Sequence, residues 1–431
     1  MDVIVIGGGI AGVATAYQLR AAGHRVCVVE RHATVAQGAT YGHSGVVLPT
    51  PLDVWFGPTF LRGGRHSAGG VICRTGFGGQ ARAFVKRLRT LHGSEAFAAR
   101  YAQLRPLIEA AESALGDAEN RFQLEYEQRK GLLYLVRSTG EWALTQPALE
   151  LLRRFEVPHH ALSAAECVAF EHNIPADPPF AGGVHFDSGR VANCPLFVKQ
   201  LKQLLDNNGG VQFQTGREVS AIRLESGRAA VELAPRLPED ARTRDVEVIS
   251  GDAVVVAAGA QTPRLVAPFG VKLPLYPLRV HTLSAPVAHE ECVPHATIVD
   301  TARRVAVTRM NHRLRISGGG VLLRTRQAEE PLAEALTEQA LALLGEASRD
   351  WAPGAARISA ALAWEGMKLL SADGLPAVGN AGHPRLFVNA GHGPAGWALA
   401  LGSAQLVAQQ ITGIKSDLPD DTVAALRPDR G

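Results

Sequence analysis

Val3-Ile4-Val5-Ile6-Gly7-Gly8-Gly9-Ile10-Ala11-Gly12 sets the fold class of this 431-residue chain. Its first four residues form a continuous β-branched run, which is typical of a buried parallel strand. A helical segment follows from Val13 to Ala22, and Gly23 closes it. A second strand runs from Arg25 to Glu30. This succession of strand, glycine turn, helix and strand predicts a Rossmann-type unit that binds a dinucleotide.

Each position of this fingerprint has a physical task. Gly7 permits the tight turn, Gly9 lets the backbone reach a pyrophosphate, and Gly12 lets the helix pack closely on the strand. The first N–H groups of the helix face the phosphates. Glu30 follows at the distance expected of an acid that accepts hydrogen bonds from ribose hydroxyls. Its charge disfavours a 2′-phosphate, so the fingerprint predicts FAD or NAD rather than NADP.

Composition limits the class of protein. Hydrophobic residues make up 46% and charged residues 20% of the chain, as in a globular protein. The net charge is only +3, without a dense basic cluster, which argues against nucleic-acid binding. Five cysteines without paired spacing predict neither a disulfide framework nor a metal site. No signal peptide or spanning segment is evident, so we expect a cytoplasmic protein that contacts a membrane at most peripherally, on the inner face of the plasma membrane.

Two distant segments favour FAD over NAD. Residues 252–260 form another apolar strand that runs into glycine, ending Ala258-Gly259-Ala260. Near the C-terminus, the strand 386–390 leads into a glycine turn at 391–397, and a helical pattern follows from Ala398 to Ile411. A second helix N-terminus of this kind would stabilise negative charge on a reduced flavin ring. A simple NAD dehydrogenase has no need for it.

The rest of the chain gives a coarse pattern of elements. We expect a helix over residues 82–115 that Gly116 ends, a strand over 131–136, and an amphipathic helix over 195–205. Residues 211–233 read as a meander of short strands, and the charged, proline-broken segment 235–245 as an exposed loop.

Taken together, these stretches give the chain a family resemblance from end to end. It resembles the D-amino-acid oxidase superfamily of FAD enzymes and, within it, the small subunit of bacterial D-amino-acid dehydrogenase. Besides the N-terminal fingerprint, the matching stretches are Gly45-Val46-Val47-Leu48-Pro49, Lys130-Gly131-Leu132-Leu133-Tyr134, Asp187-Ser188-Gly189-Arg190, Tyr276-Pro277-Leu278, Val305-Ala306-Val307-Thr308-Arg309, Asp373-Gly374-Leu375-Pro376, Asn389-Ala390-Gly391-His392-Gly393 and Gly396-Trp397.

The resemblance implies a nested α/β (α+β) architecture. A discontinuous Rossmann-type FAD domain would comprise about residues 1–80, 190–275 and 350–431. Residues 81–189 and 276–349 would form a substrate domain built on an antiparallel sheet.

The resemblance also implies a reaction in amino acid catabolism. A D-amino acid would transfer hydride from Cα to flavin N5, and the imine would hydrolyse to a 2-oxo acid and ammonia. Electrons would pass to a quinone or a partner protein, within a homo- or hetero-oligomer.

Site residues follow from the matching positions. The loop from Thr40 to Gly45 corresponds to a second flavin-contacting loop, and Val219 corresponds to a position that contacts adenine through its backbone. The residues expected to bind the cofactor are Gly7, Gly9, Ile10, Ala11, Gly12, Glu30, Arg31, Thr40, His43, Ser44, Gly45, Val46, Val47, Val219, Ala258, Gly259, Gly391, His392, Gly393, Pro394, Gly396 and Trp397. The residues expected near the reacting atoms are His392, Lys368 and His43.

Departures from the family pattern point to a shifted substrate. Gly366-Met367-Lys368-Leu369 stands where family members commonly have Gly-Leu-Arg-Pro. The expected carboxylate partner is therefore the single mobile ammonium group of Lys368 instead of the planar guanidinium group of an arginine. Arg279-Val280-His281 stands where Lys-Gly-Tyr is usual. Lys368, His281, Arg279 and Arg304 are therefore the expected substrate-binding residues, for an amino acid that is cyclic or bulkier than D-alanine.

Three alternatives remain open from the sequence. The first is an FAD enzyme that oxidises secondary or cyclic amines, such as N-methyl amino acids or proline-like compounds. The second is one subunit of a hetero-oligomeric dehydrogenase that needs its electron-accepting partner. The third is an NAD-dependent dehydrogenase, which the C-terminal glycine turn disfavours.

Overall fold

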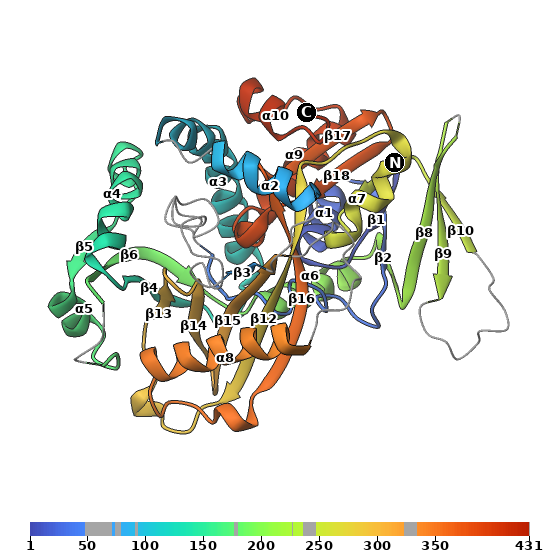
Figure 1. Ribbon diagram of the computed structural model, residues 1–431. Helices are drawn as coiled ribbons and strands as arrows, with labels where there is room; N and C mark the ends of the chain where they lie inside the picture. The colour runs from blue at the N-terminus through green and yellow to red at the C-terminus, as the bar shows by residue number, and fades with distance from the viewer. Residues whose placement is uncertain are drawn as a thin grey trace.

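A computed structural model describes residues 1–47, 71–73, 79–90, 94–175, 180–225, 227–235, 247–322 and 334–430. Its first layer is a six-stranded sheet in the order β17-β18-β11-β1-β2-β7 (Figure 1). The four neighbouring pairs from β18 to β7 are parallel, and β17 joins β18 antiparallel. The strands are β1 (Asp2–Ile6), β2 (Arg25–Glu30), β7 (Val211–Thr215), β11 (Ala253–Val256), β17 (Ala377–His383) and β18 (Leu386–Ala390).

Both faces of this sheet are covered, which explains the unbroken apolar run of its first strand. Side chains alternate along a strand, so Val3 and Val5 face one core while Ile4 and Ile6 face another. The first core is made with α1 (Ile10–Ala21), α3 (Ser94–Phe122), α6 (Cys194–Asn208), α9 (Ala400–Thr412) and α10 (Asp420–Leu426). The second is made with α7 (Thr262–Val266) and the three-stranded sheet of β8 (Arg217–Leu224), β9 (Ala229–Pro235) and β10 (Glu247–Gly251).

A second, mostly antiparallel sheet of nine strands forms the other half of the molecule. Its order is β16-β12-β15-β14-β13-β4-β6-β5, and β3 pairs with β15. Helix α8 (Glu334–Trp351) packs along it through Leu344 and Trp351, over Leu314 and Ile316 (Figure 1). The strands are β3 (Val71–Cys73), β4 (Arg129–Val136), β5 (His160–Ser163), β6 (Gly182–Val191), β12 (Leu275–Pro286), β13 (Thr297–Asp300), β14 (Val305–Met310), β15 (Arg313–Leu322) and β16 (Leu362–Ser371).

Three helices differ from the sequence prediction. The described residues of the segment 82–115 belong to two helices, α2 (Gly79–Thr90) and the start of α3, and Gly116 lies inside α3 instead of ending it. The prediction was wrong because buried Leu107, Leu115 and Ala118 hold α3 against the core, which outweighs the roughly 1 kcal/mol cost of a helical glycine. Helix α9 begins at Ala400, after a 3₁₀ turn at Gly393–Gly396, and is capped by Gly413 with a left-handed φ of 75°. The predicted loop 235–245 lies, apart from Pro235, outside the described residues.

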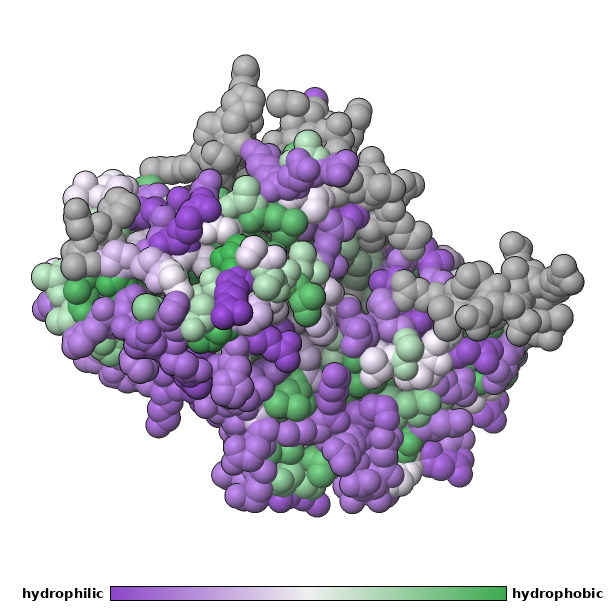
Figure 2. Space-filling model, turned by 90° about the horizontal axis from the view of Figure 1, so that it is seen from below, coloured by the Kyte–Doolittle hydropathy of each residue, from purple (hydrophilic) through white to green (hydrophobic). Residues whose placement is uncertain are grey.

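Two further helices, α4 (Thr139–Arg154) and α5 (Ala164–Phe170), flank the far end of the second sheet (Figure 1). The underside of the molecule is mainly hydrophilic, with apolar residues in separate groups (Figure 2). Within the described ranges, no helix combines the length and apolarity needed to cross a membrane. The predicted division into two domains stays a prediction; residues 362–371, expected in the FAD domain, pair with β12 in the nine-stranded sheet.

Candidate active site

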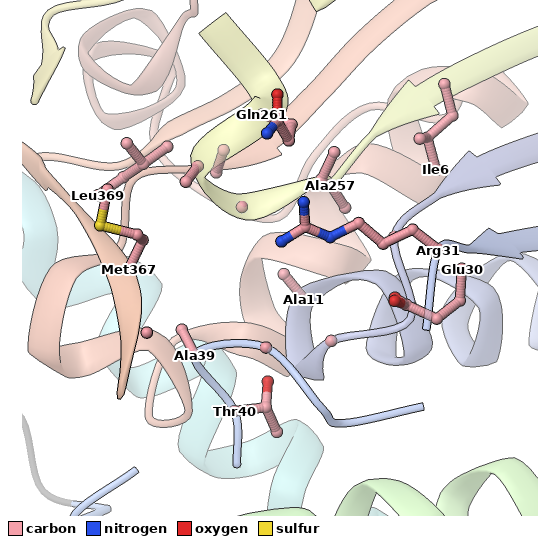
Figure 3. Close-up of a pocket in the computed structure, with 18 of the residues that line it drawn as sticks. Ile6, Ala11, Glu30, Arg31, Ala39, Thr40, Ala257, Gln261, Met367 and Leu369 are labelled. Atoms are coloured by element: carbon pink, nitrogen blue, oxygen red, sulfur yellow. The ribbon is translucent and has the colours of Figure 1, made fainter. Parts of the chain in front are cut away.

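A cavity of about 320 Å³ lies at the carboxyl ends of β1, β2, β11 and β18, the edge at which open α/β sheets bind ligands. Its size is within the range of small-molecule sites. Strand β16 of the second sheet supplies the opposite wall with Met367, Lys368 and Leu369. Figure 3 shows Met367 and Leu369 facing Ala11, Ala39 and Thr40 across this space. The cavity therefore joins the two sheets.

The glycine turn leaves room for backbone alone. A Cβ atom at Gly12 would lie 1.8 Å from the carbonyl oxygen of Gly7. Gly7 has a φ of +113°, and a Cβ atom there would lie 2.4 Å from the carbonyl oxygen of Ala257. The turn thus lets β1, α1 and β11 approach more closely than a side chain at Gly7 or Gly12 would allow. Gly7 and Gly9 also line the cavity.

Polar groups at the rim of the cavity are already ordered. The Glu30 carboxylate accepts hydrogen bonds from the N–H groups of Gly8 (2.6 Å) and His32 (2.8 Å). The Thr40 hydroxyl accepts from the N–H of Ile10 (2.9 Å), the first residue of α1. Arg31 extends its guanidinium into the cavity, between Ala11 and Ala257 (Figure 3). These groups line the half of the cavity that the fingerprint predicts for ribose and pyrophosphate.

An unsatisfied buried atom shows that the cavity suits a polar ligand. Asn389 is 1% exposed, and its amide nitrogen donates to the Thr15 hydroxyl at 3.0 Å. Its Oδ1 atom, among the described residues, has no hydrogen-bond partner, and Asn389 lines the cavity. Buried polar atoms are nearly always paired, so a donor group of a bound molecule is expected there. Together with the glycine turn, this arrangement fits a dinucleotide, whose polar groups lie between its two ring systems.

The loop of residues 40–46 is held by the second sheet. Arg315 donates from Nη1 to the carbonyl oxygens of Tyr41 (3.0 Å) and His43 (3.2 Å). The hydroxyl of Thr282 donates to the carbonyl of Gly42 (3.0 Å), and that of Thr308 to the carbonyl of Ser44 (2.9 Å). Burial lowers the pKa of Arg315, which nevertheless stays cationic because its ordinary value is so high. These three anchors were missed in the sequence, where nothing links them to a loop more than 230 residues away.

His43 lies behind the cavities instead of lining them. Its ring is 3% exposed, packs edge-on against Trp397 at 5.9 Å, and accepts a hydrogen bond at Nδ1 from the Gly45 N–H (3.1 Å). Burial lowers the pKa of His43 to about 3, and the positive charges of Lys368 and Arg315 act in the same direction. The ring is therefore neutral at physiological pH and orders the loop.

His392 does line the larger cavity. Its Nε2 atom lies 3.0 Å from the Ser403 hydroxyl, which itself donates to the carbonyl of Ala400 (3.1 Å). We therefore assign the ring proton to Nε2, donating to Ser403. Burial lowers the pKa of His392 to about 4, so this ring too is neutral at pH 7.

A smaller cavity of about 70 Å³ adjoins the first, and Lys368 lines both. Among the predicted residues, it is also lined by Ser44, Val46, His281, Arg304 and Pro394. Tyr134 and Ser317 add hydroxyl groups that were missed in the sequence because they come from distant strands. The structure thus brings together the loop of residues 40–46, the C-terminal glycine turn and three of the four residues expected to bind substrate.

Arg279, the fourth, is not among the residues that line either cavity. Its guanidinium forms an ion pair with Glu365. His281 shares that carboxylate through Nε2 (3.2 Å), and its Nδ1 atom lies 2.8 Å from the carbonyl of Gly319. Glu365 was missed in the sequence and gives both basic groups an acidic neighbour.

The other predicted cofactor residues divide into lining and supporting positions. Ile10, Ala11, Val219, Ala258, Gly259, Gly391, Gly393 and Gly396 line the larger cavity. Gly12, Gly45, Val47 and Trp397 line neither cavity and act as support. Gly45 has a φ of +94°, and Val47 donates its N–H to the carbonyl of Arg190 (2.9 Å), which fixes the loop beside the second sheet.

Comparisons with known proteins agree with this arrangement. The family profile described as "DAO: FAD dependent oxidoreductase" matches residues 2–410. A D-amino acid dehydrogenase of Rhizorhabdus wittichii is 30% identical over 427 residues, covering 96% of each chain. Among solved structures, glycine oxidase from Geobacillus kaustophilus has a TM-score of 0.69 at 19% identity, covering 100% of this chain and 98% of that one. L-proline dehydrogenase from P. horikoshii has a TM-score of 0.66 at 17% identity, with 100% and 97% coverage. The chain belongs to the DAO family of FAD-dependent oxidoreductases, and FAD is its cofactor.

Proposed function

We propose that this enzyme oxidises D-amino acids to the imine, which water converts to the 2-oxo acid and ammonia. The observation that carries the proposal is the position of Lys368, which lines both the cofactor cavity and the smaller cavity beside it. A cation at this junction can bind a carboxylate while the neighbouring Cα–H faces the cofactor. The similarity to a D-amino acid dehydrogenase over nearly the full length supports the same reading.

FAD supplies the redox step when bound, because its ring accepts the hydride that leaves Cα. The chain binds and orients the substrate. Lys368 holds the carboxylate as a point charge, and the walls made by Val46 and Val280 exclude water from the reacting carbon. His392 is neutral and donates its ring proton to Ser403, so we assign it an ordering role in the glycine turn. No ionisable group is required for the hydride step if the amine binds neutral.

The proposal extends to the division of the chain. The six-stranded sheet and its covering helices would form the FAD domain, with about residues 1–80, 190–275 and 372–431. The strand 362–371 would then belong to the substrate domain with residues 81–189 and 276–349, because it pairs with β12 along its whole length. The same strand carries Lys368, so the two domains would meet at the substrate.

The electron acceptor is proposed to be a quinone or a partner protein. This rests on the family resemblance. Reduced enzyme mixed with air-saturated buffer should reoxidise slowly and form little hydrogen peroxide, whereas a soluble quinone should reoxidise it within the turnover time. Fast peroxide formation would make the enzyme an oxidase instead.

A second candidate is oxidation of secondary or cyclic amines. Two observations favour it: the Gly366-Met367-Lys368-Leu369 segment departs from the family pattern, and the fold is similar to that of L-proline dehydrogenase. In this case proline-like or N-methyl amino acids would be oxidised faster than primary D-amino acids.

Replacement of Lys368 tests the proposed carboxylate contact. Lys368→Ala should lower kcat/KM for the best D-amino acid by roughly 100-fold, because a charge-assisted hydrogen bond of about 1.5–3 kcal/mol is lost. Lys368→Arg should recover part of it. Rates are normalised to bound flavin by absorbance, since Lys368 also lines the cofactor cavity. Exposed Lys415→Ala is the control. An unchanged kcat/KM in Lys368→Ala would remove Lys368 from the site.

A further inference from the structure

The charged side chains among the described residues that line the smaller cavity are cationic. Lys368 and Arg304 both line it, and the described lining residues include neither aspartate nor glutamate. Arg304 is 5% exposed, so its charge acts in a medium where solvent screening is weak. Such a cavity attracts anions more strongly than neutral molecules.

Arg304 is fixed in an unusual backbone conformation. It is the last residue of the turn between β13 and β14, and its φ is +55°. Its N–H donates to the carbonyl of Asp300 at 2.8 Å. Its own carbonyl packs so closely on β15 that a Cβ atom at Gly318 would lie 2.6 Å from that oxygen. Left-handed backbone is costly for an arginine and persists where the surrounding structure requires it, often at ligand sites.

The two cations reach the cavity from separate parts of the sheet. Lys368 is on β16, whereas Arg304 follows β13, and β12, β15 and β14 lie between them. Neighbouring strands are about 4.8 Å apart, so the two backbones are separated by roughly 14–19 Å. Two long side chains that line one cavity cover most of this span and leave space for a short molecule. Lys368 lies at the cofactor end, because it alone of the two also lines the larger cavity.

The remaining walls suit a short methylene chain. Val46, Val280, Val299 and Val305 line the cavity with apolar surface, while Ser44 and Ser317 add hydroxyl groups. The volume of about 70 Å³ suits a short side chain.

We propose that this enzyme prefers amino acids with a second carboxylate, with the α-carboxylate on Lys368 and the side-chain carboxylate on Arg304. This deepens the proposed function and rests on it for the identity of the reacting group. Acidic D-amino acids such as D-aspartate and D-glutamate would be oxidised in preference to their amides, which have nearly the same shape but no side-chain charge.

The first test measures binding without turnover. Holoenzyme is titrated with succinate and with butyrate, and binding is followed by the change in the flavin absorption spectrum. Wild-type enzyme should bind succinate roughly tenfold or more tightly than butyrate, because one buried charge pair distinguishes them. Arg304→Met should bring the two Kd values close together, and Arg304→Lys should give an intermediate ratio. Arg313→Met, at an exposed arginine of β15, should keep the wild-type ratio.

The second test compares D-aspartate with D-asparagine, and D-glutamate with D-glutamine, by anaerobic reduction of the flavin. A preference for the acids by roughly tenfold or more in kcat/KM is expected. Equal Kd values for succinate and butyrate in wild-type enzyme, or an unchanged ratio in Arg304→Met, would overturn the proposal whether or not D-amino acids react. A succinate preference that depends on Arg304, with no reduction by any D-amino acid, would support the dicarboxylate site and reject the D-amino acid function.

Discussion

A methyl group at position 12 has no space, since it would lie 1.8 Å from the Gly7 carbonyl oxygen. Gly12→Ala should therefore push α1 away from β1, lower the bound flavin to a small fraction of the wild-type content, and cost roughly 2 kcal/mol or more in the free energy of unfolding. Flavin absorbance per protein and urea unfolding measure both effects.

Gly116→Ala is the matched control, because Gly116 lies inside helix α3 and a Cβ atom there would meet nothing within 4 Å. This substitution should stabilise the protein by up to about 1 kcal/mol and leave the flavin in place. Equal flavin contents in the two variants would contradict the close packing of the fingerprint turn.

Two buried neutral histidines make stability depend on pH. Folding lowers the pKa of His43 to about 3 and of His392 to about 4, whereas an unfolded histidine titrates near 6.5. Between pH 4 and pH 6.5 the unfolded chain binds more protons, so stability should fall as the pH falls through that window and be unaffected above it. Each histidine contributes up to about 1.4 kcal/mol per pH unit.

His392→Asn removes one of these titrating groups. The free energy of unfolding of this variant should therefore fall less between pH 7 and pH 5 than that of the wild type. Urea unfolding at each pH measures the two slopes. His312→Asn, at a side chain that is 93% exposed, should keep the wild-type slope. Identical slopes for His392→Asn and wild type would contradict the buried, neutral imidazole.

At the scale of single elements, strand β14 holds the loop of residues 40–46 through one hydroxyl. Thr308→Val keeps the shape of the side chain but leaves the Ser44 carbonyl without its donor. A lost hydrogen bond of this kind costs about 1–3 kcal/mol, so FAD should bind roughly 5- to 100-fold more weakly. Fluorescence titration of the apoprotein with FAD measures the Kd.

Thr145→Val is the control for this variant. Thr145 is buried, but its hydroxyl donates to the Glu141 carbonyl within its own helix, α4. Its FAD affinity should match that of wild type. The same Kd in Thr308→Val and Thr145→Val would mean that the loop is ordered without β14.

The elements that could be predicted from the sequence are those that depend on local sequence patterns. The β-branched run 3–6, the glycine turn after it and the C-terminal turn at 391–396 each depend on neighbours in sequence, and each contributes at least one residue to the lining of the larger cavity. The continuation of α3 through Gly116 was missed, because glycine commonly ends a helix and the sequence alone does not show that Leu115 and Ala118 pack against the core. The anchors Thr282, Thr308 and Arg315 could not be predicted, since they bind backbone carbonyls of a distant loop and their residue types carry no such signal.

At the scale of the whole molecule, the end of the chain is tied to the strand pair that carries the C-terminal glycine turn. Arg430 donates to Asp373 and to the carbonyls of Leu375 and Pro376. Arg430→Ala would leave the Asp373 carboxylate, which is 3% exposed, without its main cation, so we expect a loss of roughly 3 kcal/mol in stability. Urea unfolding measures this loss.

Arg427→Ala is the matched control, because Arg427 pairs with Asp429 at the surface and should contribute less than about 1 kcal/mol. Similar losses for both variants would show that the terminal segment does not stabilise the fold through Asp373.

The fold class followed from the resemblance, whereas the residues predicted to bind substrate stay a prediction, and the structure brings only some of them together. Lys368, His281 and Arg304 meet at one cavity, but Arg279 pairs with Glu365 outside it. Side-chain partners on neighbouring strands depend on register, which a single sequence does not specify.

Anaerobic reduction of the flavin is the most direct measurement of the proposed reaction. The purified holoenzyme is freed of oxygen and mixed, one compound at a time, with D-, L-, cyclic and N-methyl amino acids. The account predicts rapid bleaching of the flavin by D-amino acids, fastest by D-aspartate or D-glutamate, and none by their L-isomers. Bleaching by cyclic or N-methyl amines alone, or none by any compound while flavin is bound, would contradict it.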